Sequence, residues 1–230
     1  MGKYLELFRG EVGDLTEKTK LENKPYVAYS TKEDKVTYTV VSVPVKVQPN
    51  NEIWYTTSDG RILEFNDYYC NAKLVSNTYE NGKGIAVFDQ DITGLYDGKI
   101  TVYDDGSHIY FGFLSDSYTW TGYYTPFTAT ISLPESIKRV GHITLAFGLR
   151  NDADQAVIIN PFTEITLGKN IEYIGSNKFE LDKVYYSGTL ESWNSIEFGS
   201  DYMYENSYLK VSGSNPAEGA EFYIGGVLQS

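Results

Sequence analysis

Two stretches of this sequence repeat one phrase: ISLPESIKRVG at residues 131–141 and ITLGKNIEYIGSNKF at residues 165–179. The lead-ins PFTATI and PFTEI agree as well. The matching positions all have the same offset and are apolar or glycine in both copies: Ile131 and Ile165, Leu133 and Leu167, Ile137 and Ile171, Val140 and Ile174, Gly141 and Gly175. The phrase is therefore an internal repeat.

The spacing within the repeat predicts a short strand, a turn and a second buried segment. The turn is expected at Pro134-Glu135 in the first copy and at Gly168-Lys169 in the second. The closing glycine would permit a left-handed backbone conformation. One unit has an apolar face that it cannot bury alone, so neighbouring units are expected to stack on each other.

The composition favours a folded chain built mainly of β-strands. Of the 230 residues, 41% are hydrophobic and 22% are charged. Aromatic residues are abundant, with Tyr 21, Phe 11 and Trp 3, and strands favour Tyr and Phe on half-buried faces. We therefore expect a mainly β fold.

Hairpin signals accompany the repeats. Asp59-Gly60 and Asp105-Gly106 each lie between alternating arms, and Asp-Gly is a strong hairpin signal. In KVTYTVVSVPVKV the apolar parity changes at Val40-Val41, which predicts a bulge or bend there. Pro44 makes the second half of this run an edge or a linker. The stretch HITLAFGLRNDADQAVIIN interrupts the repeats and is interpreted as an insertion with its own loop.

These patterns divide the chain into three parts. Residues 1–47 are predicted to form a small amino-terminal β module. Residues 48–199 hold the hairpin signals and the repeats. Residues 200–230 are polar and rich in glycine, and we interpret them as a carboxy-terminal cap or extension in which Gly225-Gly226 allows a last tight turn or a strand end.

Charge and cysteine content exclude several function classes. The net charge is −12, and no basic cluster exceeds a pair, so nucleic-acid binding is not expected. The single Cys70 rules out an intramolecular disulfide and is interpreted as a buried or half-buried thiol. No run reaches the length of a membrane span or of a secretory signal, so we expect a protein that is made in a cytoplasm and not exported by the usual route.

The sequence contains no recognisable catalytic or cofactor motif. It has no nucleophile elbow, phosphate-binding loop or zinc-protease motif. We interpret His108 and His142 as surface or turn residues. Asp152 and Asp154 alternate as calcium ligands do, but the remainder of a calcium loop is missing. We therefore expect no enzyme activity, no cofactor and no metal.

The aromatic segment SYTWTGYYTPF is the candidate binding site. Tyr118, Trp120, Tyr123 and Tyr124 surround a glycine among polar residues. Aromatic rings that carry a polar group suit sugar and protein surfaces equally well. The alternative is that these rings pack in the core or at a subunit interface.

Five stretches together resemble the BspA-type leucine-rich repeat proteins of Bacteroidales and of their phages. They are NEIWYTTSDGRILEF, KLVSNTYENGKGIAVFDQDIT, ISLPESIKRVG, ITLGKNIEYIGSNKF and VYYSGTLESWNSIEFG. The resemblance covers roughly residues 50–95 and 126–199 and implies a β-rich core of leucine-rich-repeat type. The second half of the family's unit survives only at residues 177–179, so we expect a short, irregular solenoid with inserted hairpins.

A second resemblance concerns the amino-terminal phrase KPYVAYSTKEDKVTYT. It is similar to a segment near the start of structural proteins of crAss-like phages of gut Bacteroidales, which implies an attachment module. The short amphipathic start, with Tyr4, Leu5, Leu7 and Phe8, is the candidate attachment surface.

These observations leave two functions. The first is a virion structural protein of a tailed phage, a head fibre or capsid-decoration protein assembled in the host cytoplasm and displayed on the virion surface. Its partners would be a capsid or other virion protein, further copies of itself as a dimer or trimer, and a host surface glycan or protein. The second is a bacterial cell-surface adhesin of the BspA type that binds host protein or glycan. The absence of a recognisable export signal favours the first.

Overall fold

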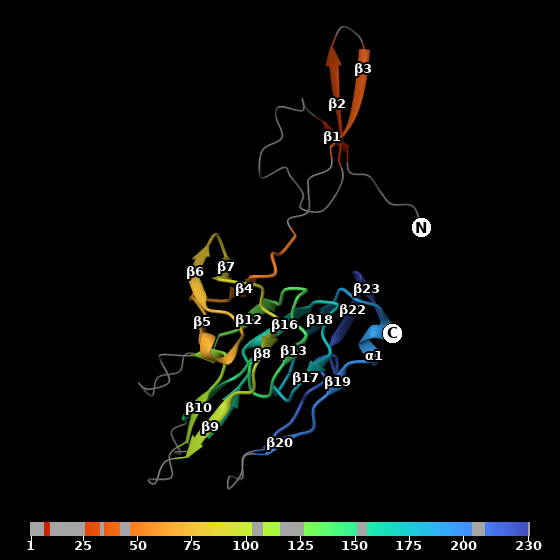
Figure 1. The fold of residues 1–230 in the computed structure, drawn as a ribbon. Helices are drawn as coiled ribbons and strands as arrows, with labels where there is room; N and C mark the ends of the chain where they lie inside the picture. The colour runs from red at the N-terminus through yellow and green to blue at the C-terminus, as the bar shows by residue number, and fades with distance from the viewer. Residues whose placement is uncertain are drawn as a thin grey trace. The chain divides into compact units, whose positions relative to one another are not determined.

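The computed structural model describes residues 7–9, 26–32, 35–41, 47–102, 108–115, 127–150, 156–203 and 210–229. Strands account for 39% of the chain, so the prediction of a mainly β protein is confirmed. The chain divides into two compact units, residues 1–47 and residues 48–230, which we call unit 1 and unit 2 (Figure 1).

Unit 1 contains a three-stranded sheet in the order β1-β2-β3. The strands are β1 (Leu7–Arg9), β2 (Tyr26–Lys32) and β3 (Lys35–Val41). β1 pairs with β2 in parallel, and β2 pairs with β3 in antiparallel. The pairing of β3 runs without a register shift to Val41, so a bulge at Val40-Val41 is wrong, while the alternative of a bend there stays a prediction.

An eight-stranded mixed sheet, here called the large sheet, dominates unit 2 (Figure 1). Its order is β23-β22-β18-β16-β12-β4-β7-β6, in which β22, β18, β16 and β12 are parallel and the other neighbours are antiparallel. The strands are β4 (Glu52–Thr57), β6 (Leu74–Glu80), β7 (Lys83–Phe88), β12 (Ala129–Ser132), β16 (Phe162–Leu167), β18 (Lys183–Tyr186), β22 (Glu221–Ile224) and β23 (Val227–Leu228).

A four-stranded parallel sheet, here called the small sheet, has the order β19-β17-β13-β8. Its strands are β8 (Gly94–Leu95), β13 (Arg139–Val140), β17 (Tyr173–Ile174) and β19 (Glu197–Phe198). Four further strand pairs lie in the described residues: β5 (Glu64–Phe65) with β11 (Leu114–Ser115), β9 (Lys99–Val102) with β10 (His108–Phe111), β14 (Phe147–Arg150) with β15 (Ala156–Ile159) and β20 (Tyr202–Met203) with β21 (Lys210–Val211). The same residues include the 3-10 turn η2 (Asp67–Tyr69) and the helix α1 (Leu190–Asn194).

The two copies of the repeat lie side by side in register. In the large sheet Ile131 of β12 pairs with Ile165 of β16, and in the small sheet Val140 of β13 pairs with Ile174 of β17. Both pairs join positions that match in the sequence repeat. The expectation that neighbouring copies stack is confirmed, and so are the turns, in which Ile137 donates to Pro134 and Ile171 donates to Gly168.

A third segment stacks on the second copy with different spacing. Val184 of β18 pairs with Ile165, and Phe198 of β19 pairs with Ile174. The chain between β18 and β19 is longer than that between β16 and β17, because it contains the five-residue helix α1. We call the strand pairs β12/β13, β16/β17 and β18/β19 the stacked units. The insertion expected after the first copy is also present, as the β14–β15 hairpin.

The core lies where the two sheets bring their apolar rows together. Ile131, Ile165 and Val184 of the large sheet are at most 2% exposed, and Val140 and Ile174 of the small sheet are 1% exposed. All belong to one continuous cluster of buried side chains. The spacing of the repeat therefore buries a residue from each of the two strands of the first two stacked units.

The closing glycines have a different role from the predicted one. Gly141 and Gly175 do not have positive φ angles. A Cβ atom on Gly141 would lie 2.5 Å from the backbone nitrogen of Asp97, and one on Gly175 would lie 2.6 Å from that of His142. The prediction of a left-handed conformation is wrong, because each glycine is needed where its segment packs directly on the backbone of the preceding segment of the small sheet.

The Asp-Gly signals have mixed outcomes. Gly60 has a φ of 79° and donates to the Thr57 carbonyl at 3.3 Å, so the turn forms. The hairpin does not, because β4 already has β7 and β12 on its two edges and β5 pairs with β11 instead. β9 and β10 do pair in antiparallel, while Asp105-Gly106 lies outside the described residues. Of the two alternatives predicted at Gly225-Gly226, the structure shows the tight turn, with φ angles of 55° and 81° between β22 and β23.

Candidate functional site

The residues predicted as a binding site, Tyr118, Trp120, Tyr123 and Tyr124, lie outside the described residues. Of the candidate attachment residues, Tyr4 and Leu5 also lie outside them. Leu7 and Phe8 belong to β1, where they pair with Val27 and Ala28 of β2. The structure therefore places part of the attachment segment in a sheet and leaves the aromatic segment a prediction.

The outer face of the large sheet carries a different set of polar and aromatic side chains. Residues that face the core alternate with partly exposed residues along β4, β12, β16 and β18, whereas in β22 all four residues are partly or fully exposed. The pairing registers align the outward residues in a row across the strands. That row contains Ile85, Trp54, Ser132, Thr166, Tyr185 and Tyr223.

A neighbouring row on the same face is more strongly polar. Thr56 of β4 pairs with Thr130 of β12, and Thr130 pairs with Glu164 of β16. Glu164 in turn pairs with Lys183 of β18, which pairs with Glu221 of β22. Each of these strands thus places at least one hydrogen-bonding side chain on the outer face.

A shallow depression of about 210 Å³ lies on this face. Its floor is the central strand β12, whose outward side chains there, Thr130 and Ser132, are small. Trp54 and Lys83 line it on the β4 and β7 side, and Glu164 lines it on the β16 side. Short side chains between long ones therefore create the hollow.

The side chains around the depression are held by contacts with one another. The Lys83 ammonium lies 3.4 Å from the centroid of the Trp54 ring, a cation–π contact. The Trp54 indole nitrogen donates to Glu52 Oε2 at 2.5 Å. The hydroxyls of Thr56 and Thr130 are hydrogen-bonded at 2.8 Å. These contacts fix the indole ring and the threonine hydroxyls in defined positions.

Two tyrosines continue the face beyond β16. The rings of Tyr185 and Tyr223 are stacked with centroids 5.1 Å apart and planes at 22°. The Tyr223 hydroxyl donates to Glu221 Oε2 at 2.8 Å, and this hydrogen bond raises the pKa of Tyr223. Lys183 lies 3.5 Å from Glu164, whose negative charge raises the pKa of the lysine. At neutral pH both groups therefore remain protonated.

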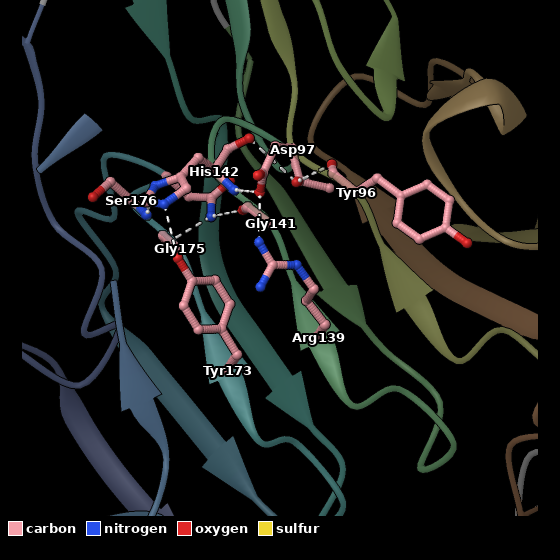
Figure 2. A network of polar contacts seen from close by, with 10 residues as sticks. Tyr96, Asp97, Arg139, Gly141, His142, Tyr173, Gly175 and Ser176 are labelled. Atoms are coloured by element: carbon pink, nitrogen blue, oxygen red, sulfur yellow. Dashed lines mark hydrogen bonds and ion pairs between the residues drawn. The ribbon is translucent and has the colours of Figure 1, made fainter. Parts of the chain in front are cut away.

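A second group of polar residues joins the stacked units along the ends of the small sheet (Figure 2). The side chain of Asp97 accepts the backbone N–H of His142 at 2.9 Å, and the His142 ring accepts that of Ser176 at 2.9 Å. Ser176 then donates its hydroxyl to the Ser200 carbonyl at 2.9 Å. Each of these side chains binds the backbone of the following segment, so the group connects four successive segments of chain.

His142 is held as a neutral ring in this group. Its Nδ1 accepts the Ser176 N–H, so the proton of the neutral ring lies on Nε2, which contacts the Tyr173 hydroxyl at 2.8 Å. Burial lowers the pKa of His142, and Arg139 lowers it further, while Asp97 opposes the shift. The prediction that His142 lies in a turn is confirmed, but its half-buried ring is part of the structural network rather than a surface group (Figure 2).

Asn177 lies beside this network with no exposed surface. Its amide nitrogen donates to the carbonyls of Gly141 and Gly175 at 2.8 and 2.9 Å, and its oxygen accepts the Leu145 N–H at 2.8 Å. One side chain thus satisfies three buried backbone groups, two in the segment that follows β13 and one in the segment that follows β17. Together with the His142 contacts, these bonds indicate that the network stabilises the stack.

Two further predictions concern cysteine and metals. Cys70 is 7% exposed, and burial raises the pKa of its thiol, so its interpretation as a buried thiol is confirmed. Within the described residues no group of three or more His, Cys, Asp or Glu side chains is arranged to hold a metal ion.

Sequence reasoning missed the outer face because it selected a clustered aromatic segment. The signal was present as alternation: Trp54 and Thr56, Thr130 and Ser132, and Glu164 and Thr166 occupy every second position of three strands. The order of the strands in the sheet had to be known before one could see that these residues lie side by side.

No family model matches the sequence, and no curated protein or solved structure is significantly similar to it. In the described part of the chain, no helix has the length and apolar character that a membrane crossing requires.

Proposed function

We propose that this chain is an attachment and display protein, specifically a virion structural protein of a tailed phage such as a head fibre or capsid-decoration protein. The observation that carries the proposal is the division into two compact units after Val47. Two units joined by one chain segment suit a protein in which one part docks and the other is displayed. The assignment to a phage particle rests on the resemblance of the sequence to structural proteins of crAss-like phages.

We further propose that unit 2 is a short, irregular solenoid of leucine-rich-repeat type. The support is the in-register stacking of three strand pairs, which contribute to both parallel ladders. The β14–β15 hairpin and helix α1 are insertions into this repeat. Stability in such stacks comes from contacts between neighbouring units.

Unit 1 is proposed to dock on a capsid or another virion protein. Leu7 and Phe8 lie in a three-residue strand at the edge of the unit 1 sheet, and edge strands offer unpaired backbone groups to a partner. A closed dimer or trimer is the default arrangement for identical subunits. The net charge of −12 would keep displayed copies soluble and apart.

A cell-surface adhesin is the second candidate. It is favoured by the outer face of the large sheet, which presents Trp54, Tyr185 and Tyr223 among hydroxyl and charged groups. Such a face suits a protein that binds host protein or glycan outside the cell. A displayed phage protein could use the face in the same way.

The test compares variants of the full chain for binding to phage particles that lack the protein. The double variant Leu7→Lys, Phe8→Lys should lose cosedimentation with the particles. The control double variant Val227→Lys, Leu228→Lys changes two exposed residues of β23 in unit 2 and should bind as the unmodified chain does. Docking through unit 1 would be contradicted if the unmodified chain did not bind the particles, or if the two double variants bound them equally well. Light scattering of the same samples measures whether the chain is a monomer, dimer or trimer.

A further inference from the structure

We propose that the outer face of the large sheet binds a neutral oligosaccharide. One sugar residue would occupy the depression above β12, and the chain would continue across β16 and β18 towards Tyr223. The inference goes beyond the proposed docking function, because it rests on unit 2 alone and holds whether or not unit 1 binds a particle.

The first argument is the kind of groups around the depression. Sugars present apolar C–H faces and a dense set of hydroxyls, so their sites combine an aromatic ring with several hydrogen-bonding groups. Here the indole ring of Trp54 lines the hollow beside the hydroxyls of Thr130, Ser132 and Thr166. Both kinds of contact are therefore available within a single hollow.

The second argument concerns charge. Lys83 lies on one side of the depression and Glu164 on the other, so the lining carries one charge of each sign. Beyond it, Lys183 is paired with Glu164, and Glu221 accepts the Tyr223 hydroxyl. In a chain with a net charge of −12 this balance favours an uncharged ligand, whose hydroxyls accept from the lysine and donate to the carboxylate.

The third argument is the spacing of the aromatic residues. Trp54 and Tyr185 belong to the same row and are separated by the two strands β12 and β16. Neighbouring strands lie about 4.8 Å apart, so these positions are roughly 14 Å apart along the row. This separation suits a chain of a few sugars, with Trp54 at one end and the stacked rings of Tyr185 and Tyr223 at the other.

A second copy of the chain fits this face less well than a sugar does. The centres of protein interfaces are depleted of charged residues. The outer face instead has Lys83, Glu164 and Lys183 on adjacent or nearby strands, and its centre is hollow. Association of two copies through this face is accordingly the competing outcome in the test.

The experiment titrates the full chain with neutral hexasaccharides of glucose, mannose and xylose, using calorimetry and NMR. Hexagalacturonate serves as the acidic probe. Because the depression is open and small, weak binding in the millimolar to micromolar range is expected for at least one neutral probe. Trp54→Ala should weaken that binding about tenfold or more. Thr166→Arg should do the same by filling the hollow while leaving the indole in place.

Tyr68→Ala is the matched control, because Tyr68 is an 80% exposed aromatic residue of η2 that does not line the depression. Its binding should equal that of the unmodified chain. Melting temperatures of all variants establish that each one is folded, and Thr166→Arg keeps the test valid if Trp54→Ala is unstable.

Several results would overturn the proposal. The first is that no neutral hexasaccharide binds at millimolar concentration. The second is that only hexagalacturonate binds. The third is that Trp54→Ala and Thr166→Arg both bind the neutral probe as tightly as the unmodified chain. A dimer that both variants convert to a monomer would show that the face is an interface between copies instead. Loss of particle docking in the Leu7→Lys, Phe8→Lys variant with sugar binding retained would leave the sugar site intact, so the two proposals fail separately.

Discussion

The large sheet is built in two ways, and the comparison between its halves shows what each requires. On one side, β12, β16, β18 and β22 pair in parallel, and partners such as Ile131 and Ile165 come from separate passes of the chain. On the other side, β6 and β7 form an antiparallel hairpin closed by Asn81-Gly82. The hairpin is specified within a few residues, whereas the parallel half depends on contacts between distant segments.

Glycine illustrates the difference. Asn81 and Gly82 have φ angles of 52° and 79°, as both central residues of a type I′ turn do, and no atom lies within 4 Å of a Cβ built on Gly82. Gly175 has no such backbone conformation but lies against the backbone of His142. The same residue type is therefore required for local conformation in one half and for close packing in the other.

The largest effect is expected from Asn177→Ala, which removes the amide shared by the stacked units. The carbonyls of Gly141 and Gly175 and the Leu145 N–H would lose their partner in a fully buried place. We expect the free energy of unfolding to fall by roughly 3–5 kcal/mol, measured by urea denaturation.

Asn170→Ala is the control for this experiment. Asn170 also belongs to the second copy of the repeat, but it is exposed and donates a hydrogen bond to the Glu135 carbonyl at 2.9 Å. Loss of this hydrogen bond should lower the free energy of unfolding by about 1 kcal/mol or less. Equal effects of the two substitutions would contradict the role given to Asn177.

The next largest effect is expected from Gly175→Ala. The added methyl group would lie 2.6 Å from the His142 nitrogen, so the second unit would have to move away from the first. We expect a loss of about 2–3 kcal/mol in unfolding free energy. Gly94→Ala in β8 is the control, because its methyl group would meet the Tyr96 ring at an ordinary 3.7 Å. A control as unstable as Gly175→Ala would mean that contact with the neighbouring unit is not the cause.

A smaller effect is expected from Gly82→Ala in the antiparallel half. The substitution meets no neighbouring atom and costs only the left-handed backbone conformation, about 1 kcal/mol by thermal or urea unfolding. Gly82→Asn should cost less, since asparagine adopts this conformation more readily than alanine. If Asn and Ala were equally destabilising here, the cost would have to come from something other than the φ angle.

The smallest effect concerns pH and the His142 ring. Its pKa is lowered in the folded state, so the unfolded chain binds more protons as the pH falls below about 6.5. The stability that His142 contributes is complete above that pH and is lost progressively as the pH falls towards the lowered pKa. Burial of the ring is the main cause of the lowered pKa, Asp97 opposes it and Arg139 adds to it, and the Tyr173 hydroxyl contacts the ring at Nε2.

The measurement is the urea midpoint of the unmodified chain and of His142→Asn between about pH 7.5 and 5.5. Asparagine does not titrate, and its side-chain oxygen can still accept the Ser176 N–H. The unmodified chain should therefore lose more stability than the variant on acidification. Parallel pH profiles would show that His142 does not contribute.

Much of the parallel half was predictable because repetition encodes register. Pairing Ile131 with Ile165 and Val140 with Ile174 requires only the constant offset between the two copies in the sequence. The third unit was not aligned in the same way, because the helix α1 lengthens the chain between its two strands. An insertion of that kind breaks the offset without breaking the stack.

Local turn signals were reliable for turns but not for partners. Asp59-Gly60 forms its turn, yet the strand after it pairs elsewhere because both edges of β4 are occupied. The candidate sheet-face site was missed for a related reason. Trp54, Thr130 and Glu164 are far apart in sequence, and only the order of β4, β12 and β16 brings them to one depression.

The sequence by itself determined the mainly β character, the stacking of the two repeat copies and the position of several turns. The β character depends on the alternation of apolar and polar residues, and the turns depend on residues that adopt positive φ angles, so both are specified by neighbouring residues. The stacking depends on a phrase that recurs at a fixed offset in the sequence. Only the tertiary structure decided the role of the repeat glycines, the buried bonds of Asn177 and the composition of the outer face. Those features arise from close contacts between segments of different strands, and no short-range pattern specifies which segments will meet.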